Sequence, residues 1–268
     1  MGGRGASSGG SGVGAGGAGG AGIGIGGASG GLAGMQNVAN QAPSPQNTPV
    51  VPNASTALSQ MTDDQLTQLY MQSRNVVMPN HLSDVSDETQ RFVYMAGVNA
   101  KPLVLDKQSF DQYLKDNNIP RSRIMSRSVG KADYVVNGTT MHLSPAQVND
   151  YTRYGDLNYV GGKWGGRVYG AGLYFDMNGG RSTGYANGAT MISVLSPTAK
   201  TITKSQLRSQ TAQWSQSHPK FARAVGAFNN SNASIYALAQ GYNVIKSDLN
   251  NYHNVIDRSA MVCMSDNI

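Results

Sequence analysis

A pattern of glycine, tyrosine and serine in the middle of the chain has the residue types needed to hold a flat aromatic ring. Gly170 and Gly172 flank a single residue, and glycines so placed let the backbone approach a ligand closely. A short strand is expected next and carries Tyr174, while Ser182 and Tyr185 follow on one face of an expected helix start. The tyrosines would stack on or bound the ring, and the serine would hydrogen-bond an amide on it. The alternative is a glycine-rich turn with tyrosines packed in a core.

The same segment resembles a known family. Gly-x-Gly-Leu-Tyr-Phe, with a serine seven residues after the phenylalanine and a tyrosine three residues later, is similar to the nicotinamide-binding segment of ADP-ribosyltransferases. It matches the poly(ADP-ribose) polymerase-like branch without a gap. The resemblance implies an α+β fold in which a pair of short β-sheets forms a cleft for NAD, the substrate. It also implies that the residues around the nicotinamide are Gly170, Gly172, Tyr174, Ser182 and Tyr185.

A second landmark of the family is an arginine or histidine on the first strand of the fold, which holds the dinucleotide. Arg127, with Ser128 beside it, lies in an expected strand over residues 124–129. An arginine offers a fixed fork of donors for phosphate or ribose. Arg127 could instead belong to a basic surface cluster with Arg121 and Arg123.

The family's catalytic glutamate would belong just before Val255, and this chain has none there. Its only glutamate is Glu88. The candidates for the slot are Tyr252, His253 and Asn254, of which the first and third share one face of the expected strand. An asparagine can bond a ribose hydroxyl but carries no charge, and a positioned carboxylate is typically worth about 10²–10⁴-fold in rate. We therefore expect transfer of a single ADP-ribose or no transfer, and no polymer.

Composition divides the chain into a low-complexity head and a domain of ordinary composition. Of the 34 glycines, 18 lie in the first 34 residues, so residues 1–34 are expected to be a disordered head. Residues 35–60, rich in Pro, Gln and Asn, are expected to form a linker. We expect a helical N-terminal cap over residues 61–120 and the ADP-ribosyltransferase-like domain over 121–268.

Several classes of function are excluded by composition. No apolar run is long enough for a membrane span, and the head lacks the pattern of a secretory signal. A lone cysteine, Cys263, and four histidines without ligand spacing predict no metal site. A net charge of +6 is too small for a nucleic-acid footprint.

Capping patterns and periodicity predict helices mixed with strands, an α+β plan. A capping box from Ser109 to Gln112 is expected to open one helix, and an Asn137-Gly138 turn is expected to join two strands. The predicted helices cover residues 62–76, 86–95, 109–116, 144–154, 204–217, 219–228 and 232–240. The predicted strands cover residues 124–129, 133–136, 139–143, 173–175, 191–195, 244–245, 254–257 and 260–263.

These observations favour an NAD-dependent mono-ADP-ribosyltransferase that modifies a protein side chain. Residues 241–258 also resemble ADP-ribosyltransferase-like proteins of phage and prophage origin, and the glycine-rich head is similar to phage structural proteins. The expected compartment is therefore the bacterial cytoplasm or a phage virion, with phage head proteins as possible partners. Two alternatives stay open: an ADP-ribosyltransferase-fold structural protein of a virion that is weakly active or inactive, and an NAD glycohydrolase.

Overall fold

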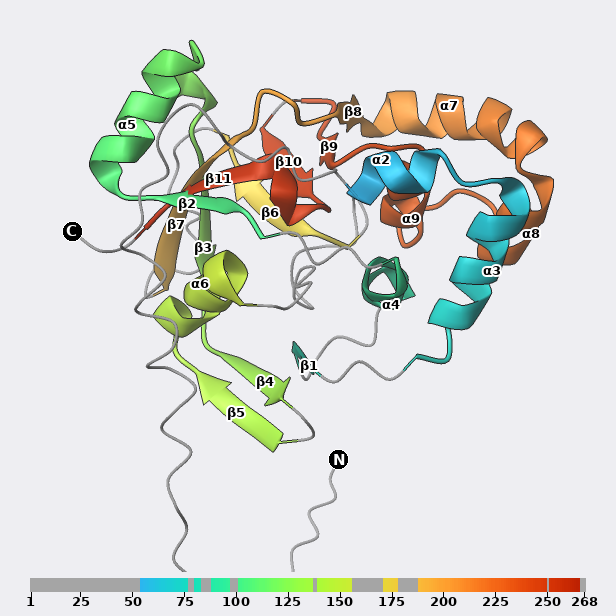
Figure 1. The fold of residues 1–268 in the computed structure, drawn as a ribbon, viewed down its shortest axis with the longest axis horizontal. Coiled ribbons are helices and arrows are strands. Elements are labelled where there is room, and N and C mark those ends of the chain that lie inside the picture. The colour runs from blue at the N-terminus through green and yellow to red at the C-terminus, as the bar shows by residue number, and fades with distance from the viewer. Residues whose placement is uncertain are drawn as a thin grey trace, which may run out of the picture. The chain divides into compact units, whose positions relative to one another are not determined.

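The protein is described by a computed structural model over residues 54–76, 80–82, 88–96, 101–136, 139–155, 171–177, 188–249 and 251–265. All of these lie within one unit of the chain, residues 42–268. The unit combines helices with a mixed β-sheet (Figure 1), so the expected α+β class is confirmed. The helices are α2 (Ala54–Ser59), α3 (Asp63–Ser73), α4 (Glu88–Met95), α5 (Lys107–Asp116), α6 (Pro145–Tyr154), α7 (Lys204–Ser217), α8 (Pro219–Val225) and α9 (Ala233–Ala239), with short 3₁₀ turns η1 (Arg121–Arg123) and η3 (Arg258–Ala260).

The strands form two sheets. A three-stranded sheet has the order β1-β4-β5, and an eight-stranded sheet has the order β2-β11-β7-β3-β6-β10-β9-β8. In the larger sheet, β2 runs parallel to β11 and β8 parallel to β9, while the other neighbours are antiparallel. The strands are β1 (Asn80–Leu82), β2 (Leu103–Leu105), β3 (Met125–Val129), β4 (Ala132–Val136), β5 (Thr139–Leu143), β6 (Leu173–Asp176), β7 (Ala189–Leu195), β8 (Thr201–Thr203), β9 (Val244–Lys246), β10 (Tyr252–Val255) and β11 (Met261–Met264).

The eight-stranded sheet is weakly joined at its middle. Within the described residues, β3 pairs with β7 over its whole length but with β6 only at Ser126 and Asp176. The sequence predicts a pair of short sheets. In the structure, the eight-stranded sheet has two halves, β2-β11-β7-β3 and β6-β10-β9-β8, which meet at that single pair.

One face of this sheet is buried under α6, and we call it the α6 face. Helix α6 contacts β3 and β7. The guanidinium of Arg258 donates to the carbonyls of Thr152 and Gly155, at 2.9 and 3.1 Å, and so satisfies groups left open at the end of α6. The apolar residues buried on this face include Met125, Phe175, Met191, Val255 and Met261.

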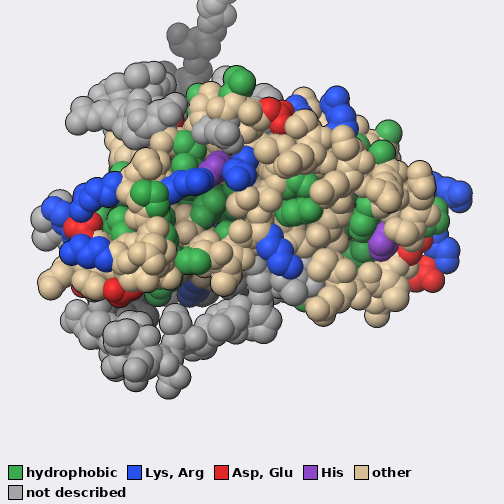
Figure 2. Space-filling model, turned by 90° about the horizontal axis from the view of Figure 1, so that it is seen from above, with side chains coloured by type: hydrophobic (Ala, Val, Ile, Leu, Met, Phe, Trp, Pro, Cys, Tyr) green, Lys and Arg blue, Asp and Glu red, His purple; other side chains and the backbone are tan. Residues whose placement is uncertain are grey.

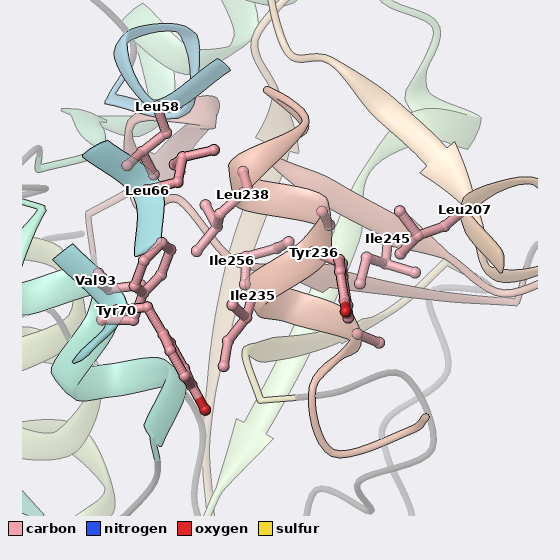
Figure 3. Packing of buried hydrophobic residues seen from close by; sticks show 14 of the residues in the cluster. Leu58, Leu66, Tyr70, Val93, Leu207, Ile235, Tyr236, Leu238, Ile245 and Ile256 are labelled. Atoms are coloured by element: carbon pink, nitrogen blue, oxygen red, sulfur yellow. The ribbon is translucent and has the colours of Figure 1, made fainter. Parts of the chain in front are cut away.

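The opposite face carries two separate apolar clusters. Phe110 and Leu114 of α5 pack against Val194 and Val262 of the first half of the sheet. Tyr236 and Leu238 of α9 pack against Ile245 of β9 and Ile256, which follows β10 (Figure 3). Other side chains lie in the middle of this face, between the two clusters.

Local capping explains most of the helix starts. Thr62 and Gln65 form a capping box at α3, and Ser144 and Gln147 form one at α6; both helices were predicted to begin at these caps. The predicted box at Ser109 is wrong. The carboxylate of Asp106 accepts from the backbone N–H of Ser109 at 2.7 Å, so α5 begins earlier. Aspartate is among the preferred N-cap residues, and Asp106 stands directly before the first residue of α5.

Three short strands were not predicted: β1, β2 and β8. Each has three residues and lies at the edge of a sheet, where alternation is too brief to be recognised. Strand β10 begins and ends two residues before its predicted bounds. The linker prediction also differs at its end, because residues 54–59 form α2 and Leu58 is buried. Within the region predicted as a cap, β2 is built into the large sheet.

A carboxylate links the first helices to the later ones. Asp63, the first residue of α3, accepts from the backbone N–H groups of Lys220 and Phe221 at 3.0 and 2.8 Å. These N–H groups open α8, which has Pro219 at its first turn. Asp63 therefore caps a helix more than 150 residues away in the sequence.

We predict that Asp63→Ala lowers the free energy of unfolding by about 1–2 kcal/mol, because it leaves two helix-end donors without an acceptor. Chemical denaturation measures this change. Asp64→Ala is the matched control, since the contact of Asp64 with the Lys220 ammonium is an exposed ion pair and its loss should cost much less. Equal losses for the two variants would contradict the capping role.

Candidate functional site

A polar strip runs along the middle of the sheet face that α5 and α9 share. Residues that pair directly across antiparallel strands have side chains on the same face. The pairs Asn254–Tyr174, Tyr252–Asp176, Ser126–Asp176 and Ser128–Thr190 therefore place their side chains together. We call this set the polar strip: Ser126, Ser128, Thr190, Tyr174, Asp176, Tyr252 and Asn254.

The strip lies where the two halves of the sheet lose their pairing. Beyond the Ser126–Asp176 pair, no described residue of β3 pairs with β6. Ser128 and Tyr174 stand on either side of this unpaired stretch, and Tyr174 is half-buried. An interrupted ladder with polar side chains on both sides can accept the edge of a ligand between the strands.

Asn254 and Gly172, two predicted site residues, pack directly against each other. A β-carbon built on Gly172 would lie 1.8 Å from the side-chain oxygen of Asn254 and 2.6 Å from its Cγ. The amide of Asn254 donates to the carbonyl of Ala171 at 3.4 Å, and the Ser234 hydroxyl of α9 donates to the same carbonyl at 2.5 Å. Asn254 is 1% exposed. The second glycine of the motif is therefore required by the space that Asn254 occupies.

Arg127 is predicted to hold the dinucleotide, and the register places it on the other face. Arg127 pairs with Met191, which is buried on the α6 face. Its strand neighbours Ser126 and Ser128 belong to the polar strip, and the hydroxyls of Ser128 and Thr190 lie 2.9 Å apart. Of the two residues predicted on β3, the structure brings Ser128 next to the other site residues and not Arg127.

The three candidates for the glutamate slot divide between the faces as the strand alternation predicts. Tyr252, 44% exposed, and Asn254 share the polar strip. His253 pairs with Phe175 and Lys246 on the α6 face and is buried. The structure therefore separates His253 from the other two.

The surroundings of His253 are positively charged. Burial, and then the charges of Lys246 and Arg123, lower the pKa of His253 to about 4. Figure 2 shows lysine and arginine side chains gathered along part of the face seen from above. A histidine with this pKa is neutral near pH 7 and is a poor general acid there.

Three predicted site residues, Gly170, Ser182 and Tyr185, lie outside the described residues. So do the predicted head, most of the linker and the Asn137-Gly138 turn. The described part of the motif is residues 171–177.

Ser126, Asp176 and Thr190 belong to the strip but were not predicted as site residues. Asp176 follows Tyr174 by two positions, and strand alternation alone puts both on one face. That signal was available in the sequence. The positions of Ser126 and Thr190 depend on register between strands far apart in the sequence, which no local pattern reveals.

A shallow hollow elsewhere on the surface carries no comparable set of groups. It lies along α7, where the ring of Trp214 stacks on that of His218 with centroids 3.9 Å apart. Its lining is otherwise made of glutamines and one serine: Gln210, Gln213, Gln216, Gln240 and Ser217. We therefore take the polar strip as the candidate site.

No protein-family model, curated protein or solved structure matches this chain. Among the described residues, no helix has the length and apolar character needed to cross a bilayer. In the same part of the chain, no three histidine, cysteine, aspartate or glutamate side chains gather as a metal site would require. The site is thus argued from its own geometry.

Gly172→Ala should destabilise the protein by about 1–3 kcal/mol, because the added methyl group overlaps the side chain of Asn254. The free energy of unfolding measures this. The same substitution in an Asn254→Ala background should cost clearly less, since the overlapping atoms are gone. An equal cost in both backgrounds would show that Asn254 is not what excludes a side chain there.

Stability should also depend on pH through His253. The folded pKa, about 4, is below the usual 6.5, so the unfolded chain binds the proton more readily. The contribution of His253 to the free energy of unfolding is present above pH 6.5 and is lost as the pH falls toward 4. This lowers the free energy of unfolding by about 2 kcal/mol between pH 8 and pH 5. Denaturation at several pH values should show a shallower dependence for His253→Leu, whereas His142→Leu, at an exposed position, should keep the original slope. Parallel curves for all three proteins would contradict this assignment.

Proposed function

We propose that this protein is an NAD-dependent mono-ADP-ribosyltransferase that modifies a protein side chain. The observation that carries the proposal is the polar strip, in which Tyr174 and Asn254 face each other on adjacent strands and Gly172 packs beside them. Tyr174 and Asn254 form a register pair, and Asn254 packs on Gly172. Gly172 and Tyr174 belong to one motif of the family resemblance, and Asn254 belongs to its glutamate slot, about 80 positions further along the chain.

The groups of the strip suit the two ends of the bond to be broken. The half-buried ring of Tyr174 offers an apolar face and a phenol to the nicotinamide. Ser182 and Tyr185 would complete that end, as the family resemblance implies. Asn254 lies beside Tyr174, where an amide can bond a hydroxyl of the adjoining ribose.

The reaction itself needs positioning and charge stabilisation. The bond between the ribose C1′ and the nicotinamide nitrogen breaks, and its electron pair stays with nicotinamide, which leaves neutral. A nucleophilic atom of the acceptor side chain then bonds to C1′ and gives up a proton. NAD⁺ and the acceptor thus yield nicotinamide, the ADP-ribosylated protein and H⁺. The ribose carries positive charge while the bonds change, and donors or charges held in place lower that barrier.

Two predicted residues receive no role at the reacting bond. The side chain of Arg127 lies on the α6 face. We therefore assign Ser128, its neighbour on β3, to the nicotinamide end. His253 lies on the α6 face as well, and its lowered pKa keeps it neutral. With a neutral asparagine at the slot before Val255, transfer of a single ADP-ribose is the expected outcome.

The full chain should bind NAD in calorimetry, and Tyr185→Ala should weaken that binding about tenfold, because a ring-stacking contact is lost. Tyr94→Ala is the matched control, since Tyr94 is an exposed tyrosine of α4. Both variants should keep the melting temperature of the unaltered protein.

Incubation of the full chain with labelled NAD and a bacterial lysate distinguishes the activities. Labelled protein together with free nicotinamide is the expected result. Nicotinamide without labelled protein would favour an NAD glycohydrolase. Absence of both signals and of NAD binding would overturn the proposal and favour a structural role in a phage virion.

A further inference from the structure

Asp176 occupies a central place in the polar strip. It pairs with Ser126 of β3 on one side and with Tyr252 of β10 on the other, and it is half-buried. It is the residue through which the two halves of the large sheet meet. Its carboxylate therefore lies on the face that carries Tyr174 and Asn254.

Asp176 is also the only acidic residue of the strands that form the strip. Strands β3, β6, β7 and β10 are described in full, and no other aspartate or glutamate occurs in them. Along β6, Asp176 is two residues from Tyr174, a separation of about 7 Å on one face. The acid is thus one strand step from the Tyr174–Asn254 pair, within the reach of one bound ribose.

Two other acids are excluded by their contacts. The Asp257 carboxylate is fully buried and accepts from the Asn243 amide at 3.1 Å and from the Ser259 hydroxyl at 2.6 Å. Glu88 accepts from the phenol of Tyr70 at 3.1 Å, in the cluster around α3 and α4. Each has a structural role away from the strip.

We propose that Asp176 supplies the carboxylate for cleavage of the nicotinamide–ribose bond, an inference that rests on the proposed function. The negative charge of Asp176 stabilises the positive charge that develops on the ribose as the electron pair leaves with nicotinamide. The carboxylate also accepts the proton that the acceptor releases, and passes it to water. The Asp176 carboxylate on β6 thus takes the charge-stabilising role of the glutamate that β10 lacks.

The test compares Asp176→Asn, Asp176→Ser and Asp176→Glu in the full chain, with Asp116→Asn on the exposed end of α5 as the matched control. We expect Asp176→Asn to lower kcat for nicotinamide release by about 10²–10⁴-fold. The Kd for NAD, measured by calorimetry, should stay within about threefold or tighten, because removal of a negative charge does not weaken binding of an anionic dinucleotide. Asp176→Glu should restore part of kcat, and the acidic limb of the pH–rate profile should disappear only in the uncharged variants.

The outcomes separate this inference from the proposed function. If the unaltered protein turns over NAD and Asp176→Asn does so within about threefold, Asp176 is not the catalytic acid, while the proposed function stands. If the unaltered protein neither binds nor cleaves NAD, both fall. If Asp176→Asn and Asp176→Ser both fail to fold, or if kcat and Kd deteriorate together, the residue is structural and the inference is overturned.

Discussion

The antiparallel pairing of β6 with β10 is the constraint on which the rest of the candidate site depends. Its register places Asn254 opposite Tyr174 and His253 opposite Phe175. Because side chains alternate along a strand, a shift of one residue would exchange the two faces completely. Asn254 would then enter the apolar cluster under α6, and His253 would enter the strip. The packing of Asn254 on Gly172 opposes such a shift, since no other residue at position 172 leaves room for it.

The two faces of the eight-stranded sheet differ in the side chains that they carry. The α6 face carries one apolar cluster, beside which the Arg258 guanidinium is held by a carbonyl at the end of α6. The other face has two apolar clusters, under α5 and under α9, with polar residues between them. Hydroxyls and a carboxylate thus stand between two apolar clusters on this face.

The weak junction between the halves of the sheet belongs to the same arrangement. One register pair, Ser126–Asp176, joins β3 to β6 among the described residues, whereas β3 and β7 pair over five positions. A full ladder would bring β3 and β6 within the usual interstrand distance along their length and leave no room between Ser128 and Tyr174. Beyond this pair, Ser128 and Tyr174 are both partly exposed.

The sequence by itself determined the elements whose signals are local. The capping boxes at Thr62 and Ser144 involve atoms three residues apart, so they form independently of tertiary packing. The same holds for most strands. Gly172, Tyr174 and Asn254 were assigned to one site by the family resemblance rather than by a local pattern, and the β6–β10 register makes them neighbours. Tertiary structure decided the faces on which Arg127 and Ser128 lie, the edge strands β2 and β8, and the place of Asp176 beside Ser126 and Tyr252. These depend on register between segments far apart in the sequence, such as the Leu103–Val262 pair, and register is set by packing of whole strands and helices rather than by any short pattern.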